Sequence, residues 1–270
     1  MGTSASHSGP KSGVSFDPPW LDDIDTPETT ETPKQNPKEE PVAPLLAPPA
    51  RFRSARQNLG DYIKSGSRDS LKKSLGHYSR TGMGGARNVA NRMRHSANIA
   101  SKLYSSFSLL REGNEPTIRS IISSYRIEGT DVYGMIDAIA GFICGDGGSL
   151  DEISPINSIS SALSDLFDKN PDIDIAALSD DNVWSLVSSF LSYEAFSKIQ
   201  LDIGQGFESK DIPLVDRITR LSDMREYLES EISSQVNDVR NELGDKIPSN
   251  LQNVMMTAIE RTFKVFEVTE

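Results

Sequence analysis

After residue 50, apolar side chains recur at intervals of three and four residues along almost the whole chain, which is the spacing of one face of an α-helix. The longest such pattern runs from Ile218 to Leu243, and another runs from Leu251 to Phe266. No alternating run of apolar and polar residues is long enough to predict a β-strand, and no segment repeats at a fixed period. The periodicity therefore predicts an all-α fold, a helical bundle whose last two helices form an antiparallel hairpin.

Turn and capping residues divide this pattern into helices. Gly145 ends the apolar segment 132–143, which we expect to be the central core helix. Pro155 predicts a turn further along the chain. Asp180 or Asp181 is expected to cap the helix that follows, because a carboxylate accepts hydrogen bonds from the free N–H groups of a first helical turn.

The first 50 residues differ in composition from the rest. They hold ten of the fifteen prolines, eight acidic and three basic side chains, and few large apolar residues. Such a segment cannot bury enough apolar surface to offset the entropy lost on folding. We therefore expect residues 1–50 to be a disordered, Pro-rich N-terminal tail and linker. A basic helical arm at residues 51–110 and an acidic helical body at residues 111–270 should follow.

One short stretch of the tail has the character of a docking motif. Phe16, Trp20 and Leu21 bring two aromatic rings and a leucine close together, and Pro18 and Pro19 between them keep the backbone extended. We expect the three apolar residues to contact a partner protein. The alternative is that aromatic residues occur in the tail by chance.

The basic arm carries most of the positive charge. Between Arg51 and Tyr104 the chain has twelve Lys or Arg and two Asp, a net charge of +10 in a protein whose net charge is −11. Helices in this arm, including a long one expected over residues 86–110, are basic and amphipathic. They suit a phosphate-bearing ligand, an acidic membrane surface or an acidic protein. The residues expected to bind such a partner are Arg51, Arg53, Arg56 and Arg80. The alternative is a charged face that is merely solvated.

Few residues are available for chemistry. The three histidines have no second ligand at metal spacing, and a lone cysteine, Cys144, excludes an internal disulfide. Cys144 could act as a nucleophile only with a base beside it; its segment holds no histidine, so a buried structural role is favoured. The glycine-rich runs at residues 82–85 and 144–148 lack the context of a phosphate-binding loop. We expect no metal, no cofactor and no enzymatic activity.

The sequence also bears on location. No apolar run approaches the roughly 18 residues that suggest a membrane span, and the N-terminus lacks the apolar core of a signal peptide. A single cysteine fits a reducing compartment. We therefore expect a cytoplasmic protein that has no membrane partner.

Three stretches of the chain, taken together, point to a family. They are the start MGTSASHSGPKSG followed by Pro18-Pro19-Trp20, the stretch RFRSARQNLGDYIKSGSRDSLKKSLGHYSRTGMGGA, and the segment from Ile136 to Glu152. They resemble the QatB family, a component of the Qat anti-phage defence system. The resemblance covers about residues 1–153, and the C-terminal half adds only general helical character to it.

The resemblance implies a bacterial cytoplasmic protein and a set of partners. Members of this family are encoded beside an ATPase (QatA), a QueC-like enzyme of 7-deazaguanine chemistry (QatC) and a TatD-like nuclease (QatD). The resemblance implies that this chain is the non-enzymatic member. Its main partner is then the QueC-like enzyme, with the ATPase and the nuclease as further candidates.

The resemblance also implies a role for Gly2. Removal of Met1 would leave a free α-amine, whose ordinary pKa of about 7.7 to 8.0 keeps a useful fraction neutral and nucleophilic. The QueC-like partner would activate a deazaguanine carboxylate with ATP and join it to this amine as an amide. The competing interpretations are N-myristoylation, since Gly2 followed by Ser6 also fits that acceptor pattern, and an unmodified terminus.

Two classes of function remain in view. The first is an adaptor and modification substrate, whose helical body docks partner proteins while its tail is presented to the QueC-like enzyme. The second is a nucleic-acid-binding module, which uses the basic arm to hold phage DNA or RNA for the partner nuclease. Aromatic residues within the arm are few, so stacking on bases is not strongly indicated.

Overall fold

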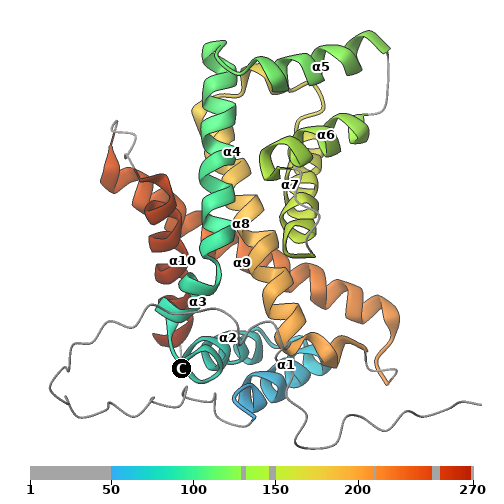
Figure 1. Cartoon of the computed structure of the whole chain (residues 1–270). Coiled ribbons are helices and arrows are strands. Elements are labelled where there is room, and N and C mark those ends of the chain that lie inside the picture. Colours follow the sequence, from blue (N-terminus) through green and yellow to red (C-terminus); the bar gives the residue numbers. More distant parts are fainter. Residues whose placement is uncertain (1–49, 129–131, 146–149, 209–210, 245–249, 269–270) are drawn as a thin grey trace, which may run out of the picture. The chain divides into compact units, whose positions relative to one another are not determined.

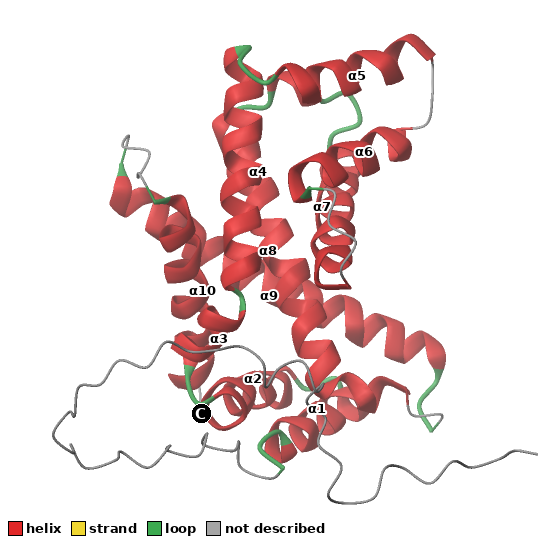
Figure 2. Cartoon of the chain, in the orientation of Figure 1, coloured by secondary structure: helices red, strands yellow, loops and turns green. Residues whose placement is uncertain are grey.

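The computed structural model describes residues 50–128, 132–145, 150–208, 211–244 and 250–268. These residues form ten α-helices, and no β-strand is present among them (Figure 1, Figure 2). The helices are α1 (Arg53–Ser65), α2 (Arg68–His77), α3 (Ala86–Arg92), α4 (Arg94–Glu112), α5 (Pro116–Glu128), α6 (Val132–Cys144), α7 (Leu150–Lys169), α8 (Asp180–Ile203), α9 (Leu214–Leu243) and α10 (Leu251–Val268). A π-helical turn, η2 (Tyr78–Met83), and two 3₁₀ turns, η3 (Ile175–Ala177) and η4 (Gly204–Glu208), complete them. The expected all-α fold is confirmed.

Local chemistry explains where several helices begin and end. Gly66 ends α1 with a φ of 71°, a left-handed conformation that suits a residue without a side chain, and its N–H donates to the Tyr62 carbonyl at 2.7 Å. The N-cap of α8 is Ser179, whose Oγ accepts from the Asn182 N–H at 3.2 Å. The cap predicted at Asp180 or Asp181 is therefore one or two residues late.

The turn predicted at Pro155 is also wrong, because α7 continues through this residue. Pro155 lies early in the helix and is buried. A proline at this place removes one backbone hydrogen bond. Packing of α7 against α6 and α8 is consistent with tertiary contacts outweighing that local cost.

The central helix of the fold is α8, which packs against α4, α7 and α9. Figure 1 shows α8 running alongside α4. Buried residues lie on most sides of α8, and Val183, Trp184, Leu186 and Val187 are all buried within five consecutive positions. The sequence assigned this central place to the segment 132–143. That segment forms α6, which packs on α5 and α7 and leaves Tyr133 62% exposed.

The basic helices share one core with the C-terminal helices. The described residues, from Ala50 onwards, belong to a single compact unit. Ring contacts run from Phe52 to Tyr78, from Tyr78 to Phe263, and from Phe263 to Phe266, with centroid distances of 5.5, 6.2 and 5.5 Å. This aromatic chain joins α1 and η2 to α10. The boundary expected near residue 110 falls inside the compact unit, at the end of α4.

Candidate interaction surface

Half of the predicted site residues lie outside the described residues. Gly2, the expected modification site, and the docking motif residues Phe16, Trp20 and Leu21 all precede residue 50. They remain predictions from the sequence. The structure does describe the other half, which are the four arginines of the basic arm.

The first group of arginines surrounds a buried aromatic ring. Phe52, at the start of α1, is 8% exposed and stacks on Tyr78 with an interplanar angle of 15°. The guanidinium carbons of Arg51 and Arg56 lie 4.7 and 5.9 Å from the centroid of the Phe52 ring, within range of cation–π attraction. A Cβ on Gly82 would lie 2.4 Å from Phe52 Cδ1, so a residue without a side chain leaves room for the ring.

The second feature is an anchor at Asp202, near the end of α8. Arg92 donates to both carboxylate oxygens of Asp202, at 2.5 and 2.9 Å, and the Tyr78 hydroxyl donates to the same carboxylate at 3.0 Å. Arg56 Nη2 donates to the Asp202 backbone carbonyl at 2.8 Å. Bidentate arginine–carboxylate pairs are geometrically specific. The anchor therefore fixes the basic helices against α8.

This environment changes the acidity of two groups. Burial is the main cause that raises the pKa of Tyr78 above its ordinary value, and the neighbouring Asp202 carboxylate adds to it. Burial opposes the charge of Arg92, yet the hydrogen bond to Asp202 outweighs it and raises the pKa of Arg92. Tyr78 is therefore neutral and Arg92 charged at any physiological pH.

Arg80 forms a second anchor, at the end of α10. Arg80 Nη2 donates to the Glu267 backbone carbonyl, and the Ser79 hydroxyl donates to Glu267 Oε1 at 2.6 Å. The two contacts connect η2 to the last turns of the chain. Arg56 and Arg80 therefore have structural contacts in addition to their charge.

Arg53 differs from these arginines. Its side chain is exposed and makes no hydrogen bond or ion pair with another described residue, and the same holds for Lys64, Arg68 and Lys73. These four cations of α1 and α2 carry charge that is directed to solvent. Charge available to a partner is thus separated from charge used in the fold.

Sequence reasoning missed a buried acidic centre in α8. Glu194 is 0% exposed and accepts hydrogen bonds from the hydroxyls of Ser96 at 2.6 Å, Ser154 at 2.8 Å and Ser158 at 2.8 Å. Lys198 Nζ lies 3.5 Å from Glu194 Oε2. The centre connects α4, α7 and α8. Its one signal in the sequence is a single acid among the apolar residues of segment 183–199.

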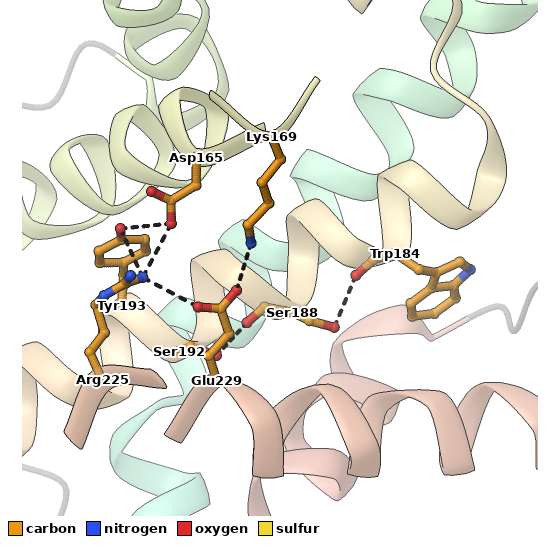
Figure 3. A network of polar contacts seen from close by, with 8 residues as sticks. All are labelled: Asp165, Lys169, Trp184, Ser188, Ser192, Tyr193, Arg225 and Glu229. Atoms are coloured by element: carbon orange, nitrogen blue, oxygen red, sulfur yellow. Dashed lines mark hydrogen bonds and ion pairs between the residues drawn. The ribbon is translucent and has the colours of Figure 1, made fainter. Parts of the chain in front are cut away.

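A second polar network joins α7, α8 and α9, and Figure 3 shows it with its hydrogen bonds. Arg225 Nη1 donates to Asp165 Oδ2 at 3.2 Å, to the Tyr193 hydroxyl at 3.0 Å and to Glu229 Oε2 at 3.3 Å. Tyr193 in turn donates to Asp165 at 2.9 Å, and Lys169 pairs with Glu229 at 3.5 Å. Each carboxylate is paired with a cation, which is the arrangement of a structural clamp.

The structure also shows where Cys144 lies and whether the described residues could hold a metal ion or span a membrane. Cys144 is half-buried at the end of α6 and packs against the core. Within the described ranges, no group of three or more His, Cys, Asp or Glu is placed to hold a metal ion. Among the same residues, no helix combines the length and the apolar character needed to cross a membrane.

Comparison with known proteins identifies the family. The family model described as "Qat anti-phage system associated protein QatB" matches residues 84–266, from the start of α3 to near the end of α10. Comparisons with curated proteins and with solved structures found no match. The matched region includes the C-terminal half, which had shown only general helical character. It leaves out residues 1–83, which hold the first of the three stretches that suggested the family and all but the last three residues of the second. Because the match spans more than half of the sequence, this chain belongs to the QatB family of Qat anti-phage system associated proteins.

Proposed function

We propose that this protein is a non-enzymatic adaptor of a bacterial anti-phage defence system, acting in the cytoplasm. Its N-terminal tail is presented to a QueC-like partner, QatC, which attaches a 7-deazaguanine at Gly2. Membership of the QatB family is the observation that carries the proposal. The stretches at the start of the chain that resemble the family support the assignment of the tail.

The chemistry of Gly2 suits this role. With Met1 removed, the α-amine of Gly2 is the most weakly basic amine in the tail, whereas the side chain of Lys11 has an ordinary pKa of about 10.4. More of the α-amine is therefore neutral at cytoplasmic pH, and it attacks an activated carboxylate more readily. The product is an amide, which carries no charge at the former amine.

Mass spectrometry of the N-terminal peptide tests the proposal. We expect coexpression with the active QueC-like partner to add the mass of one deazaguanine acyl group, with the fragment ions placing it on Gly2 and not on Lys11. Expression without the partner, or incubation of the purified proteins with the deazaguanine acid but without ATP, should leave the peptide unmodified. A myristoyl mass, or an unmodified Gly2 beside an active partner, would refute the proposal.

A matched pair of insertions tests whether the position of the amine matters for defence. A glutamate added after Met1 prevents removal of Met1, so that Gly2 becomes an internal residue without a free α-amine. A glutamate added after Lys11 lengthens the tail equally and leaves the α-amine of Gly2 in place. We expect the first insertion to abolish modification and phage protection, and the second to preserve both. Full protection from the first variant would contradict the proposal.

The helical unit then has the role of docking partners. Membership in the Qat system implies Qat partners, and we propose QatC as the principal one, with QatA and QatD as further candidates. The expected observation is that these proteins copurify at moderate salt without nucleic acid.

A nucleic-acid-binding module is the second candidate function. The observation that favours it is the set of exposed cations on α1 and α2 that have no hydrogen-bond or ion-pair partner among the described residues, namely Arg53, Lys64, Arg68 and Lys73. Binding to random duplex DNA with a steep dependence on salt concentration would support this function. Weak binding with a shallow salt dependence would favour the adaptor.

A further inference from the structure

A polar groove lies where α3 and the start of α4 pack against α10. Figure 1 shows α3 beside α10 in this part of the fold. The groove has a volume of about 330 Å³, and its lining residues are Arg87, Ala90, Asn91, Arg94, Gln252, Asn253, Met256 and Glu260. All eight residues lie within the part of the chain that matches the QatB family.

The groove is positively charged. Arg87 is exposed and its side chain makes no hydrogen bond or ion pair with another described residue. Arg94 is exposed too, and its only side-chain hydrogen bond within the described chain is a long one, to Asn91 Oδ1 at 3.4 Å. The acid of the groove, Glu260, pairs with Lys264 at 2.8 Å. Two guanidinium groups therefore face solvent with capacity to bind a carboxylate each.

Three residues with side-chain amides, Asn91, Gln252 and Asn253, lie among the charged residues of the groove. Gln252 donates through Nε2 to the Arg94 carbonyl at 3.2 Å, and its amide oxygen is left to accept. The side chain of Asn253 makes no hydrogen bond with another described residue. An amide carries both donors and an acceptor, which is the same pattern that a peptide group presents. These residues can therefore pair with the backbone of an extended chain.

From these features we infer that the groove binds an extended acidic segment of a partner protein. Arg87 and Arg94 take carboxylates, and the amides of Asn91, Gln252 and Asn253 take backbone N–H and C=O groups. A phosphate chain fits less well, because its oxygens only accept hydrogen bonds and would leave the amide oxygens of the groove without a donor. The inference goes beyond the proposed adaptor role and does not depend on modification at Gly2.

The spacing of the two arginines suggests what the segment looks like. Arg87 lies in α3 and Arg94 is the first residue of α4, and the two helices meet at Met93. Seven residues at a helical rise set their separation along the chain at no more than roughly 10 Å. In an extended peptide of the polyproline II type, side chains three residues apart lie on the same side and are separated by about 9 Å. The groove should therefore prefer a peptide with two acidic residues separated by two others.

Fluorescence anisotropy with labelled peptides tests the inference. The main probe is a serine-rich peptide with two glutamates three positions apart, and its comparisons are the same peptide with two glutamines, the same peptide with adjacent glutamates, and an oligothymidylate. We expect the main probe to bind at least about tenfold more tightly than the glutamine peptide, because two charge-assisted hydrogen-bond pairs are lost. It should also bind more tightly than the peptide with adjacent glutamates.

Variants locate the binding on the surface. Arg87→Ala combined with Arg94→Ala should weaken binding of the main probe about tenfold or more. The matched control, Arg68→Ala combined with Lys73→Ala, removes the same charge outside the groove and should change it less than about twofold. Asn253→Ala, which leaves the charge unchanged, should weaken the peptide and leave oligothymidylate binding as it was.

Three results would overturn the inference. They are equal effects of the two double variants, equal affinity for the glutamate and glutamine peptides, and tighter binding of oligothymidylate that is lost with Arg87 and Arg94. Circular dichroism checks folding. If the double variant unfolds, peptide binding by Arg87→Ala alone decides the question. The Arg87 side chain makes no hydrogen bond or ion pair with another described residue, so its removal costs the fold no such contact. Loss of Gly2 modification with peptide binding intact would refute only the proposed function.

Discussion

At the scale of single residues, the tightest packing involves the ring of Phe52, which lies beneath Arg51 and Arg56 and against Gly82. Phe52 approaches Gly82 so closely that an added methyl group has no space. Gly60, within α1, differs because nothing lies within 4 Å of its would-be Cβ. Gly82 is therefore needed to make room for a neighbouring ring, whereas Gly60 is not, and alanine substitutions at the two positions should have different effects on stability.

We predict that Gly82→Ala lowers the free energy of unfolding by about 1–3 kcal/mol, because Phe52 must shift within a packed core. Gly60→Ala should leave it unchanged or raise it by about 0.5–1 kcal/mol, because alanine favours the helix over the unfolded chain. Urea unfolding followed by circular dichroism measures both. A Gly82→Ala protein as stable as Gly60→Ala would show that Phe52 does not fill the space over Gly82.

The basic residues also divide into two kinds. Arg56 and Arg80 donate to backbone carbonyls of α8 and α10, whereas Arg53 and Lys64 are directed to solvent. Reversal of Arg51, Arg53, Arg56 and Arg80 together would therefore change the fold and the surface charge at once. Separate pairs of substitutions distinguish the two effects.

We predict that Arg56→Ala and Arg80→Ala each lower the free energy of unfolding by about 1 kcal/mol, because each loses a charge-assisted hydrogen bond at a partly exposed site. Arg53→Glu combined with Lys64→Glu should change stability by less than about 0.5 kcal/mol per site and still reduce phage protection. Thermal unfolding and a plaque assay with the whole Qat system provide the two measurements. Unchanged protection by the second pair would show that this charge is only solvated.

At the scale of helices, the sequence predicts which face of a helix is apolar better than it predicts where that helix lies in the fold. The apolar periodicity correctly predicted two helices at the C-terminus, because α9 and α10 each have a clear apolar stripe and pack together. It misplaced the centre of the fold, since α8 is buried on most of its sides, and its apolar residues form no narrow stripe to detect. Its cap was misread because Ser179, Asp180 and Asp181 are adjacent and all three are good capping residues.

The candidate site, too, was predictable only in part: the sequence located its charged residues but not their partners. The charge pattern located the arginines, yet their partners Asp202 and Glu267 lie more than a hundred residues away in the chain, where no local signal connects them. The groove between α3 and α10 was likewise invisible, because Arg94 and Gln252 are separated by 158 residues. Contacts of this kind come from tertiary packing, which a single sequence does not reveal.

At the scale of the whole molecule, buried tyrosines link the fold to pH. Burial is the largest cause that raises the pKa of Tyr62, Tyr193 and Tyr227 to about 12 each, and it raises that of Tyr78 as well. In the unfolded chain these groups ionise near pH 10. A raised pKa in the folded state means that their contribution to stability is complete below about pH 10 and is lost as pH rises towards 12.

We predict that the free energy of unfolding varies little with tyrosine ionisation up to about pH 10 and then falls steeply between about pH 10 and 12. Urea unfolding across this range, with tyrosinate absorbance recorded in parallel, measures the effect. Tyr62→Phe should reduce the steepness by about one proton, at the expense of the 2.9 Å hydrogen bond to the Arg220 carbonyl. Complete ionisation of the folded protein near pH 10 would contradict the prediction.

The contacts that hold the beginning of α1 to η2 and α8, and η2 to α10, have a mechanical consequence. The chain preceding residue 50 continues directly into Arg51, Phe52 and Arg56, which are held by Tyr78 and Asp202, while Arg80 holds η2 to Glu267. A pull applied to the N-terminus by a partner that grips Gly2 would therefore load α8 and, through η2, α10 before α1 could peel away. The protein would behave as a tether fixed to its own core, able to bear tension between two bound proteins without first unravelling.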